Sequence, residues 1–265
     1  MDYFETKPFW DAQLEHSTIV PDFAAWQDRH ESLSAQADAL GLPERIPTGP
    51  DDSQAVWRTT LGRTTHALTF IHGGYWQRNT ANCYSFVAET AAASKSIFYN
   101  VDHRLMPHAR MEELVEDAVQ ACEIARRYSE RMILVGHSSG AHLAVEAAMR
   151  MSEPPEAVVA ISGLYELDPL RYAVIQDELS LTLDEVRAFS PKERAAALRC
   201  PIHLFAGAEE TMEYQRQSAR MYEAVRDAGG SATITFVDGH HHSSLIAELA
   251  DPHTALSRSV QRLVG

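Results

Sequence analysis

Short apolar runs and longer amphipathic stretches alternate along most of the chain. The apolar runs are rich in β-branched and aromatic residues, and they predict strands at 67–71, 97–101, 132–135, 157–161, 202–206 and 232–237. The clearest helix is predicted at 111–128, where one apolar stripe consists of Leu114, Ala118, Cys122 and Ala125. Continuous apolar strands separated by such helices predict an α/β fold, with a mostly parallel sheet covered by helices on both faces.

The residues before the predicted strand 67–71 do not follow this alternation. Residues 1–50 are polar, contain scattered aromatic residues, favour a helix near 24–40, and end in the breaker-rich run GLPERIPTGPDD. We interpret them as an amino-terminal arm of a single domain that spans 1–265. Residues 54–61 and 65–71 flank Gly62-Arg63, which indicates either a hairpin or two sequential strands.

The interval between the strands near 160 and 202 is longer than the others. It carries two capping-box patterns, Thr182 to Glu185 and Ser190 to Glu193, and Pro191 follows the second predicted cap. These signals predict a short helical insertion, about 164–199, above the carboxyl edge of the sheet. Such a position suits a lid over a substrate.

Composition and charge narrow the class of protein. The chain has 265 residues, of which 45% are apolar and 23% charged, so it is an ordinary globular sequence that needs no disulfide or metal to fold. There are 37 acidic and 23 basic residues, a net charge of −14, which makes nucleic acid an unlikely partner because its phosphates would be repelled.

The cysteine spacing, the first residues and the lengths of the apolar runs together indicate the cellular compartment. Cys83, Cys122 and Cys200 are widely spaced and fit free thiols in a reducing compartment. The first residues, MDYFETKPFW, resemble no signal peptide, and no apolar run approaches the roughly 20 residues of a membrane span. We therefore expect a cytoplasmic protein that does not interact with membranes.

The strongest chemical signal is Gly136-His137-Ser138-Ser139-Gly140, a G-x-S-x-G sequence between a predicted strand and a predicted helix. Small flanking residues permit the sharp strand-to-helix turn that exposes a serine hydroxyl as a nucleophile. The alternative interpretation is a plain glycine and serine turn. The strand-to-helix context favours Ser138 as a nucleophile.

A second signal, His72-Gly73-Gly74-Tyr75-Trp76, follows the strand 67–71. Adjacent glycines let backbone N–H groups point at a ligand, so Gly73, Gly74 and the N–H of Ser139 are predicted to form an oxyanion hole. Beside them, Tyr75 and Trp76 are predicted to bind an aromatic substrate as walls of its site, and the alternative interpretation is that they are core residues.

A serine nucleophile also needs a base and an orienting carboxylate, in the chain order Ser, Asp or Glu, His. Glu209 and Glu210 follow the strand 202–206, and the triplet His240 to His242 follows the strand 232–237. Late strands of such sheets bring residues at their carboxyl ends to one site. Because consecutive side chains project in different directions, we interpret the histidines as a source of one base and not as a metal site.

These segments give the chain a resemblance to a known family. FIHGGYW at 70–76, VDHRLMPHARMEELVED at 101–117, GHSSGAHLA at 136–144 and EYQRQS at 213–218 resemble the α/β-hydrolase superfamily, and within it the kynurenine formamidase (arylformamidase) group and its bacterial esterase relatives. The resemblance implies the α/β-hydrolase fold with Ser138 as nucleophile. It also implies Glu210 as the acid, six residues before Arg216, and His242 as the base. His241 stays an alternative, because His242 precedes Ser243 where the family usually has Phe.

The function implied by this resemblance is hydrolysis of a small acyl amide or ester through an acyl-serine intermediate. The preferred substrate is a small aromatic molecule, an aryl formamide such as N-formylkynurenine, and neither a metal nor an organic cofactor is needed. The resemblance also allows a homodimer. Two alternatives stay open: a broad short-chain carboxylesterase with the same catalytic residues, and a non-catalytic binding protein of the hydrolase fold.

Overall fold

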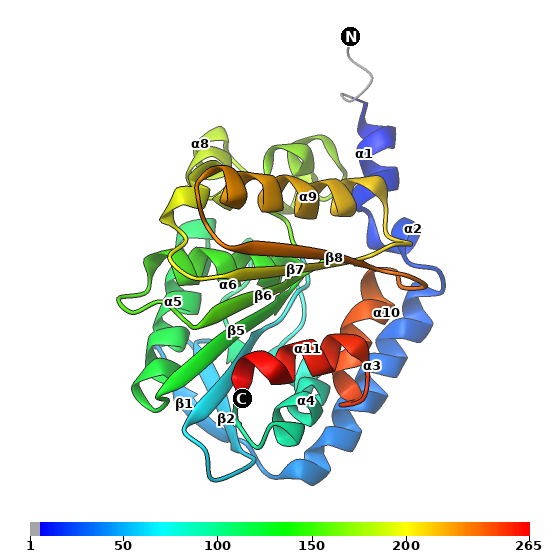
Figure 1. Cartoon of the computed structure of the whole chain (residues 1–265). Coiled ribbons are helices and arrows are strands. Elements are labelled where there is room, and N and C mark those ends of the chain that lie inside the picture. Colours follow the sequence, from blue (N-terminus) through cyan, green and yellow to red (C-terminus); the bar gives the residue numbers. More distant parts are fainter. Residues whose placement is uncertain (1–5) are drawn as a thin grey trace.

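A computed structural model describes residues 6–265 of the chain (Figure 1). Its centre is an eight-stranded sheet with the strand order β1-β2-β4-β3-β5-β6-β7-β8. The strands are β1 (Glu44–Pro47), β2 (Ala55–Thr60), β3 (His66–Ile71), β4 (Ile97–Asp102), β5 (Arg131–His137), β6 (Ala157–Ile161), β7 (Ile202–Gly207) and β8 (Ala232–Val237). Only the β1–β2 and β2–β4 pairs are antiparallel. The predicted, mostly parallel sheet is therefore confirmed.

The alternative left open at Gly62-Arg63 is decided by strand pairing. Strands β2 and β3 are sequential but not a hairpin, because β4 lies between them and pairs with both. The structure also contains a strand that the sequence did not indicate. Strand β1 lies at the edge of the sheet with mostly exposed residues and a terminal proline, so it has no hydrophobic alternation to reveal it.

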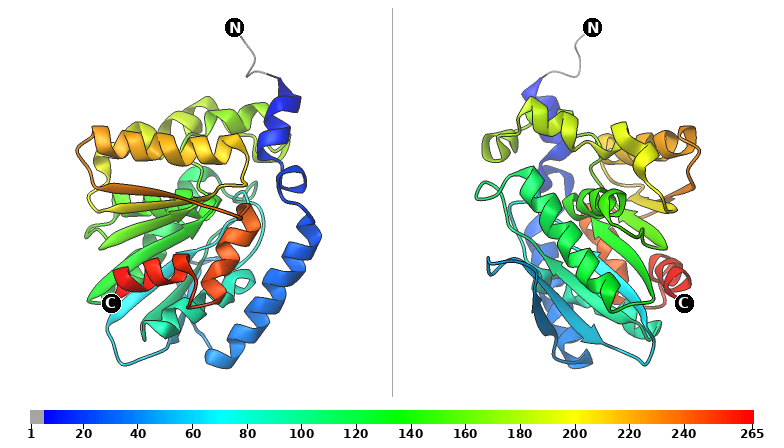
Figure 2. Two further views of the ribbon diagram at one scale, coloured as in Figure 1. Left: turned by 45° about the vertical axis from the view of Figure 1, so that its right-hand side comes forward. Right: turned by 90° about the vertical axis from the view of Figure 1, so that its left-hand side faces the viewer.

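Helices cover both faces of the sheet, as the views in Figure 2 show. One face carries α5 (Met111–Arg127), α6 (Ser139–Arg150) and α9 (Met212–Asp227), and the other carries α4 (Ala88–Ala93), α10 (His242–Ala247) and α11 (Ala255–Val264). The stripe predicted on 111–128 is fully buried in α5 at Leu114, Ala118, Cys122 and Ala125. Its apolar face is thus what attaches α5 to the sheet.

The amino-terminal arm lies along one side of the sheet (Figures 1 and 2). It contains α1 (Lys7–Leu14), α2 (His16–Ile19) and α3 (Phe23–Ala37). Trp10, Leu14 and Val20 of the arm are buried in the same hydrophobic cluster as α5, α6 and α9. The predicted bounds 1–50 include residues 1–5, which lie outside the described residues.

The insertion between β6 and β7 consists of short helical segments: η3 (Asp168–Tyr172), α7 (Gln176–Leu179), α8 (Leu183–Ala188) and η4 (Pro191–Ala197). The predicted capping box at Thr182 is confirmed, since its hydroxyl accepts from the Glu185 N–H. The one predicted at Ser190 is wrong. The Ser190 hydroxyl instead accepts from Leu167 N–H and donates to the carbonyl of Val186. Within residues 6–265, no helix is long and apolar enough to cross a membrane.

Candidate active site

Ser138 occupies the turn between β5 and α6, with φ 57° and ψ −125°. This region of backbone space is strained for a residue with a side chain, and strain of this kind is typical of functional sites. The turn is enforced by its glycines. A Cβ on Gly136 would lie 2.4 Å from the carbonyl oxygen of Gly140, and a Cβ on Gly140 would lie 2.1 Å from that of Ile71. Glycine is therefore required at both ends of the G-x-S-x-G pattern, because other backbone atoms lie too close for a Cβ at either position.

The glycine pair after β3 lies directly against this turn. A Cβ on Gly73 would be 2.9 Å from Cβ of Ser138, so only glycine fits, and Gly74 has φ +127°, which residues with side chains avoid. The Gly73 carbonyl accepts from Asn79 Nδ2 at 3.0 Å and lies 2.9 Å from Nδ1 of His72. Burial lowers the pKa of His72 to about 4. A neutral imidazole therefore helps to fix the orientation of this loop.

The end of β7 and the start of α10 bring a carboxylate and an imidazole together. Oε2 of Glu210 lies 3.7 Å from Nδ1 of His242, and the two side chains are 0% and 3% exposed. The other oxygen, Oε1 of Glu210, accepts from the backbone N–H of Gly207 at 3.0 Å and from the hydroxyl of Ser162. These donors orient the carboxylate so that one oxygen faces the imidazole.

The neighbouring candidates point elsewhere. Glu209 is exposed. The ring of His241 packs edge-on against Trp26 of α3, with ring centres 5.1 Å apart, and Nε2 of His240 lies 3.1 Å from Glu248. The three histidines thus diverge, and no group of three metal-ligating side chains occurs among residues 6–265. The geometry favours Glu210 and His242 over their neighbours as partners of Ser138.

Exchange of the two histidines for alanine tests this choice. His242→Ala is expected to lower kcat by about 10⁴-fold or more, because it removes the proton acceptor, whereas His241→Ala stays within a few-fold of wild type. Hydrolysis of p-nitrophenyl acetate measures both. The reverse order of activities would assign the base to His241.

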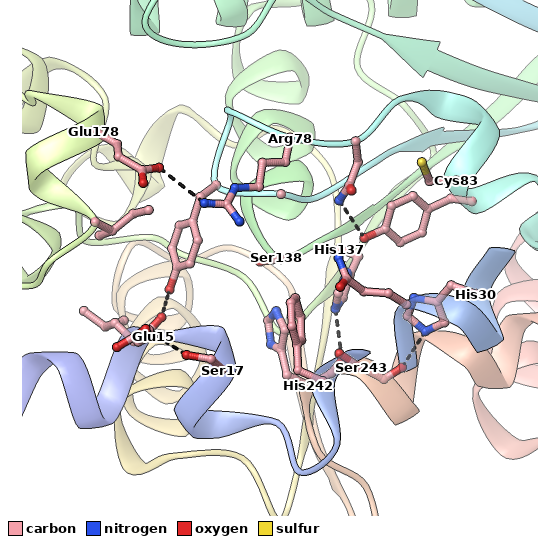
Figure 3. A pocket seen from close by; sticks show the side chains of 18 of the residues that line it. Glu15, Ser17, His30, Arg78, Cys83, His137, Ser138, Glu178, His242 and Ser243 are labelled. Carbon is pink, nitrogen blue, oxygen red and sulfur yellow. Dashed lines mark hydrogen bonds and ion pairs between the residues drawn. The ribbon is translucent and has the colours of Figure 1, made fainter. Parts of the chain in front are cut away.

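A cavity of about 310 Å³ opens onto Ser138 (Figure 3). Figure 3 shows His242 beside Ser138, with Arg78 and Glu178 on one side and His30 and Cys83 on the other. An apolar part of the lining comes from the arm and the 164–199 insertion, and consists of Leu14, Phe23, Ala173, Val174 and Ile175. The cavity is thus closed by segments far from the catalytic motifs in sequence.

The two aromatic residues predicted to bind substrate differ in their positions. Tyr75 lines the cavity, but the Trp76 side chain does not. Trp76 is 1% exposed and packs edge-on against His142 in the core, with ring centres 5.1 Å apart. The prediction for Trp76 is therefore wrong, because both residues have positive φ and successive side chains leave the loop in different directions.

Sequence reasoning missed several residues around Ser138. His137 packs against His242 with ring centres 4.6 Å apart, and the ring of Tyr214 lies 4.4 Å from His242 on another side. His30, on the arm, lies 2.9 Å from the carbonyl of Ser243 through Nε2. Tyr214 lies within the EYQRQS segment, so a sequence signal existed for it, but His30 lies in a segment without any motif.

Comparison with known proteins adds to this geometry. A model of the alpha/beta hydrolase fold family matches residues 68–246, which include Gly73, Ser138, Glu210 and His242. This chain belongs to the alpha/beta hydrolase fold family. The assignment confirms the fold predicted from the sequence. It also supports hydrolysis as the general class of reaction at this site.

Several individual proteins are similar to this chain in sequence or in fold. A kynurenine formamidase from Danio rerio is 24% identical over 212 residues, which cover 75% of this chain and 72% of that protein. A solved structure from Silicibacter sp. TM1040, provisionally assigned as a thioesterase, has a TM-score of 0.86 and 22% identity and covers 94% of this chain and 97% of its own. An esterase/lipase from an uncultured bacterium has a TM-score of 0.67 and 17% identity, covering 97% and 94%. The resemblance to hydrolases and to kynurenine formamidases is thereby confirmed.

Proposed function

We propose that this hydrolase cleaves small acyl amides and esters, and that aryl formamides such as N-formylkynurenine are its preferred substrates. The observation that carries the proposal is the convergence of Ser138, the Gly73-Gly74 loop and the buried Glu210–His242 pair on one cavity of about 310 Å³. Similarity to a kynurenine formamidase supports the choice of acyl group.

The proposed mechanism assigns a step to each group. Oγ of Ser138 attacks the formyl carbon while His242 accepts the serine proton, and Glu210 holds the imidazole in the tautomer that presents a free lone pair to the serine. Backbone N–H groups of Gly73, Gly74 and Ser139 stabilise the oxyanion. His242 then gives its proton to the leaving amine, and water, activated by the same imidazole, releases formate from the acyl-serine.

The shape of the site supports a small acyl group. The Gly73 backbone lies so close to the Ser138 side chain that a Cβ on Gly73 would clash with it, and the cavity that opens onto the serine is large enough for one aromatic ring system. The formyl group would therefore sit against the glycine loop. The aryl leaving group would lie against Leu14, Phe23, Tyr75 and Val174, which would supply most of the binding free energy.

The esterase/lipase of the same fold favours a second candidate, a short-chain carboxylesterase, which would use the same residues. Comparison of kcat/KM for N-formylkynurenine and for p-nitrophenyl acetate distinguishes the two functions. We expect the formamide to have the higher value. A clear preference for the ester would identify a carboxylesterase, and failure of a fluorophosphonate to label Ser138 would indicate a binding protein without this chemistry.

Removal of metal ions tests the same mechanism independently. Activity is expected to be unchanged after dialysis against EDTA and to be lost after treatment with a fluorophosphonate, because each proposed step uses only side-chain and backbone groups. Initial rates before and after dialysis measure this. Loss of activity on chelation, with recovery on addition of Zn²⁺, would contradict the proposed mechanism.

A further inference from the structure

The loop that contains the glycine pair, residues 73–79, folds back so that its last side chain lies against its first two residues. The N–H groups of Gln77 and Arg78 both donate to the carbonyl of Gly74, at 3.0 and 3.1 Å. Asn79 then has a φ of 72°, a left-handed conformation that asparagine adopts more readily than most residues. A Cβ on Gly74 would lie only 2.8 Å from Nδ2 of Asn79, so the Asn79 amide packs directly against the glycines.

The Asn79 amide holds the carbonyl of Gly73. Nδ2 of Asn79 lies 3.0 Å from this oxygen, and because a carbonyl only accepts, the amide atom that faces it must be the NH₂ nitrogen. The same nitrogen lies 3.5 Å from the buried hydroxyl of Tyr84, which fixes the plane of the amide. Nδ1 of His72 also lies 2.9 Å from the Gly73 carbonyl. The carbonyl is therefore held by two donors, one before and one after the glycine pair in sequence.

The carbonyl of Gly73 and the N–H of Gly74 belong to one peptide group. Such a group is planar, and in the trans form, which this bond has, its C=O and N–H point in opposite directions. A donor that fixes the carbonyl therefore fixes the direction of the N–H as well. The Gly74 N–H donates to no group that the structure describes, and Gly74 lines the cavity that opens onto Ser138. It is thus a donor available to a bound ligand.

We propose that Asn79 is a positioning residue of the oxyanion hole: its amide holds the Gly73 carbonyl, and through the shared peptide group it keeps the Gly74 N–H directed at the oxygen of the tetrahedral intermediate. The proposal rests on the proposed function, because it takes Ser138 as the nucleophile and Gly74 as an oxyanion donor. Without the Asn79 bond, His72 alone holds this peptide group. The group then rotates more freely, and an N–H that has to be reoriented in each reaction stabilises the negative charge less.

Two variants that lack the amide donor, but differ from each other in charge and flexibility, test this role. Asn79→Gly is uncharged and accepts a φ of 72° without strain, but it makes the loop more flexible. Asn79→Asp keeps the size of the side chain, but it adds a negative charge. Each is expected to lower kcat/KM for p-nitrophenyl acetate about tenfold. This is less than the roughly 10²- to 10³-fold cost of losing an oxyanion donor outright, because His72 still holds the carbonyl.

Two ketones of nearly the same shape separate positioning from general damage to the cavity. Oγ of Ser138 adds to the carbonyl carbon of 2,2,2-trifluoroacetophenone, the C=O electron pair moves to the oxygen, and His242 takes the serine proton, so the adduct carries an oxyanion. Acetophenone binds in the same cavity without this addition. Both Asn79 variants are expected to raise the inhibition constant of the fluorinated ketone about tenfold and to leave that of acetophenone within about twofold of wild type.

The matched controls are Asn82→Gly and Asn82→Asp. Asn82 is exposed, lies in the short helical segment η2 (Ala81–Val87) directly after the loop, and does not line the cavity that opens onto Ser138. These variants introduce the same flexibility and the same charge a few residues away, without removing a donor to Gly73. Both are expected to keep the wild-type kcat/KM. Thermal unfolding checks that all four variants are folded.

The outcomes distinguish this inference from the proposed function. Slow hydrolysis by both Asn79 variants, with selective loss of affinity for the fluorinated ketone, supports the role of Asn79. A slow Asn79→Gly alone would reflect flexibility, and a slow Asn79→Asp alone would reflect charge. Either result, or an equal loss of affinity for both ketones, overturns the role of Asn79 while the nucleophile stands. If a fluorophosphonate does not label Ser138 in the wild type, the proposed function and this inference both fail. The predicted pattern in an enzyme that hydrolyses esters but not formamides supports Asn79 and rejects only the substrate.

Discussion

Ser138→Ala is expected to lower kcat by about 10⁴- to 10⁶-fold and to leave the fold unchanged. The substitution removes the only atom that would form a bond to the acyl carbon, so what is left is catalysis by the oxyanion hole and by substrate binding. The fold should tolerate it because alanine keeps the Cβ of serine. The strained φ of 57° is therefore no less favourable than before.

Hydrolysis of N-formylkynurenine and p-nitrophenyl acetate by the purified variant, together with its melting temperature, checks this expectation. Ser129→Ala is a suitable control, because Ser129 is also buried but lies next to the opposite end of β5. The control should keep wild-type activity. Turnover by Ser138→Ala within tenfold of wild type would show that another residue is the nucleophile.

The second large effect is expected for Glu210→Gln. Oε1 of Glu210 accepts from Gly207 N–H and from the Ser162 hydroxyl, so the oxygen of a glutamine must take this position. Its NH₂ group then faces Nδ1 of His242, where Glu210 now has a bare oxygen 3.7 Å away. Two donors cannot bond to each other, so the imidazole has to present a lone pair at Nδ1 and carry its proton on Nε2.

With its proton on Nε2, His242 cannot accept the proton of Ser138. A wrong tautomer of this kind costs about 10⁴-fold in kcat when the geometry is otherwise kept. Glu209→Gln is the matched control, since Glu209 is exposed and one residue away, and it should stay within a few-fold of wild type. Measured kcat values that fall for Glu209→Gln and not for Glu210→Gln would refute the assignment of the acid.

Local sequence patterns predicted most of the scaffold correctly. The α5 helix was expected at 111–128 and spans Met111–Arg127, and each of the six expected strands is present. The two features that the sequence did not predict correctly, a strand and a helix cap, also have local causes. Strand β1 is short, mostly exposed and paired on one side, with β2, and the hydroxyl of Ser190 bonds to residues outside its predicted cap.

The residues of the site also fall into two groups: those that the sequence predicted, and those whose orientation only the structure shows. The turn at Ser138 and the loop at Gly73 are visible in the sequence, because a close approach between backbones permits only glycine at neighbouring positions. Position along the chain limited the acid to Glu209 or Glu210, and the family resemblance selected Glu210. The orientation of the two side chains favours the same residue, since Glu210 is buried against Ser162 and Glu209 faces solvent.

What the amino-acid sequence determined by itself is the hydrolase fold and the order of the chemical groups along the chain, because strand periodicity and glycine-dependent turns are short-range properties. The tertiary structure alone decided that Trp76 enters the core, that the arm and the insertion close the cavity, and that Tyr75 meets Tyr214. These features depend on contacts between residues far apart in the sequence: Tyr75 and Tyr214 are separated by 139 positions, and Asp11 of the arm and Val174 of the insertion by 163. Such contacts leave no periodic trace in either segment, so only the packed chain reveals them.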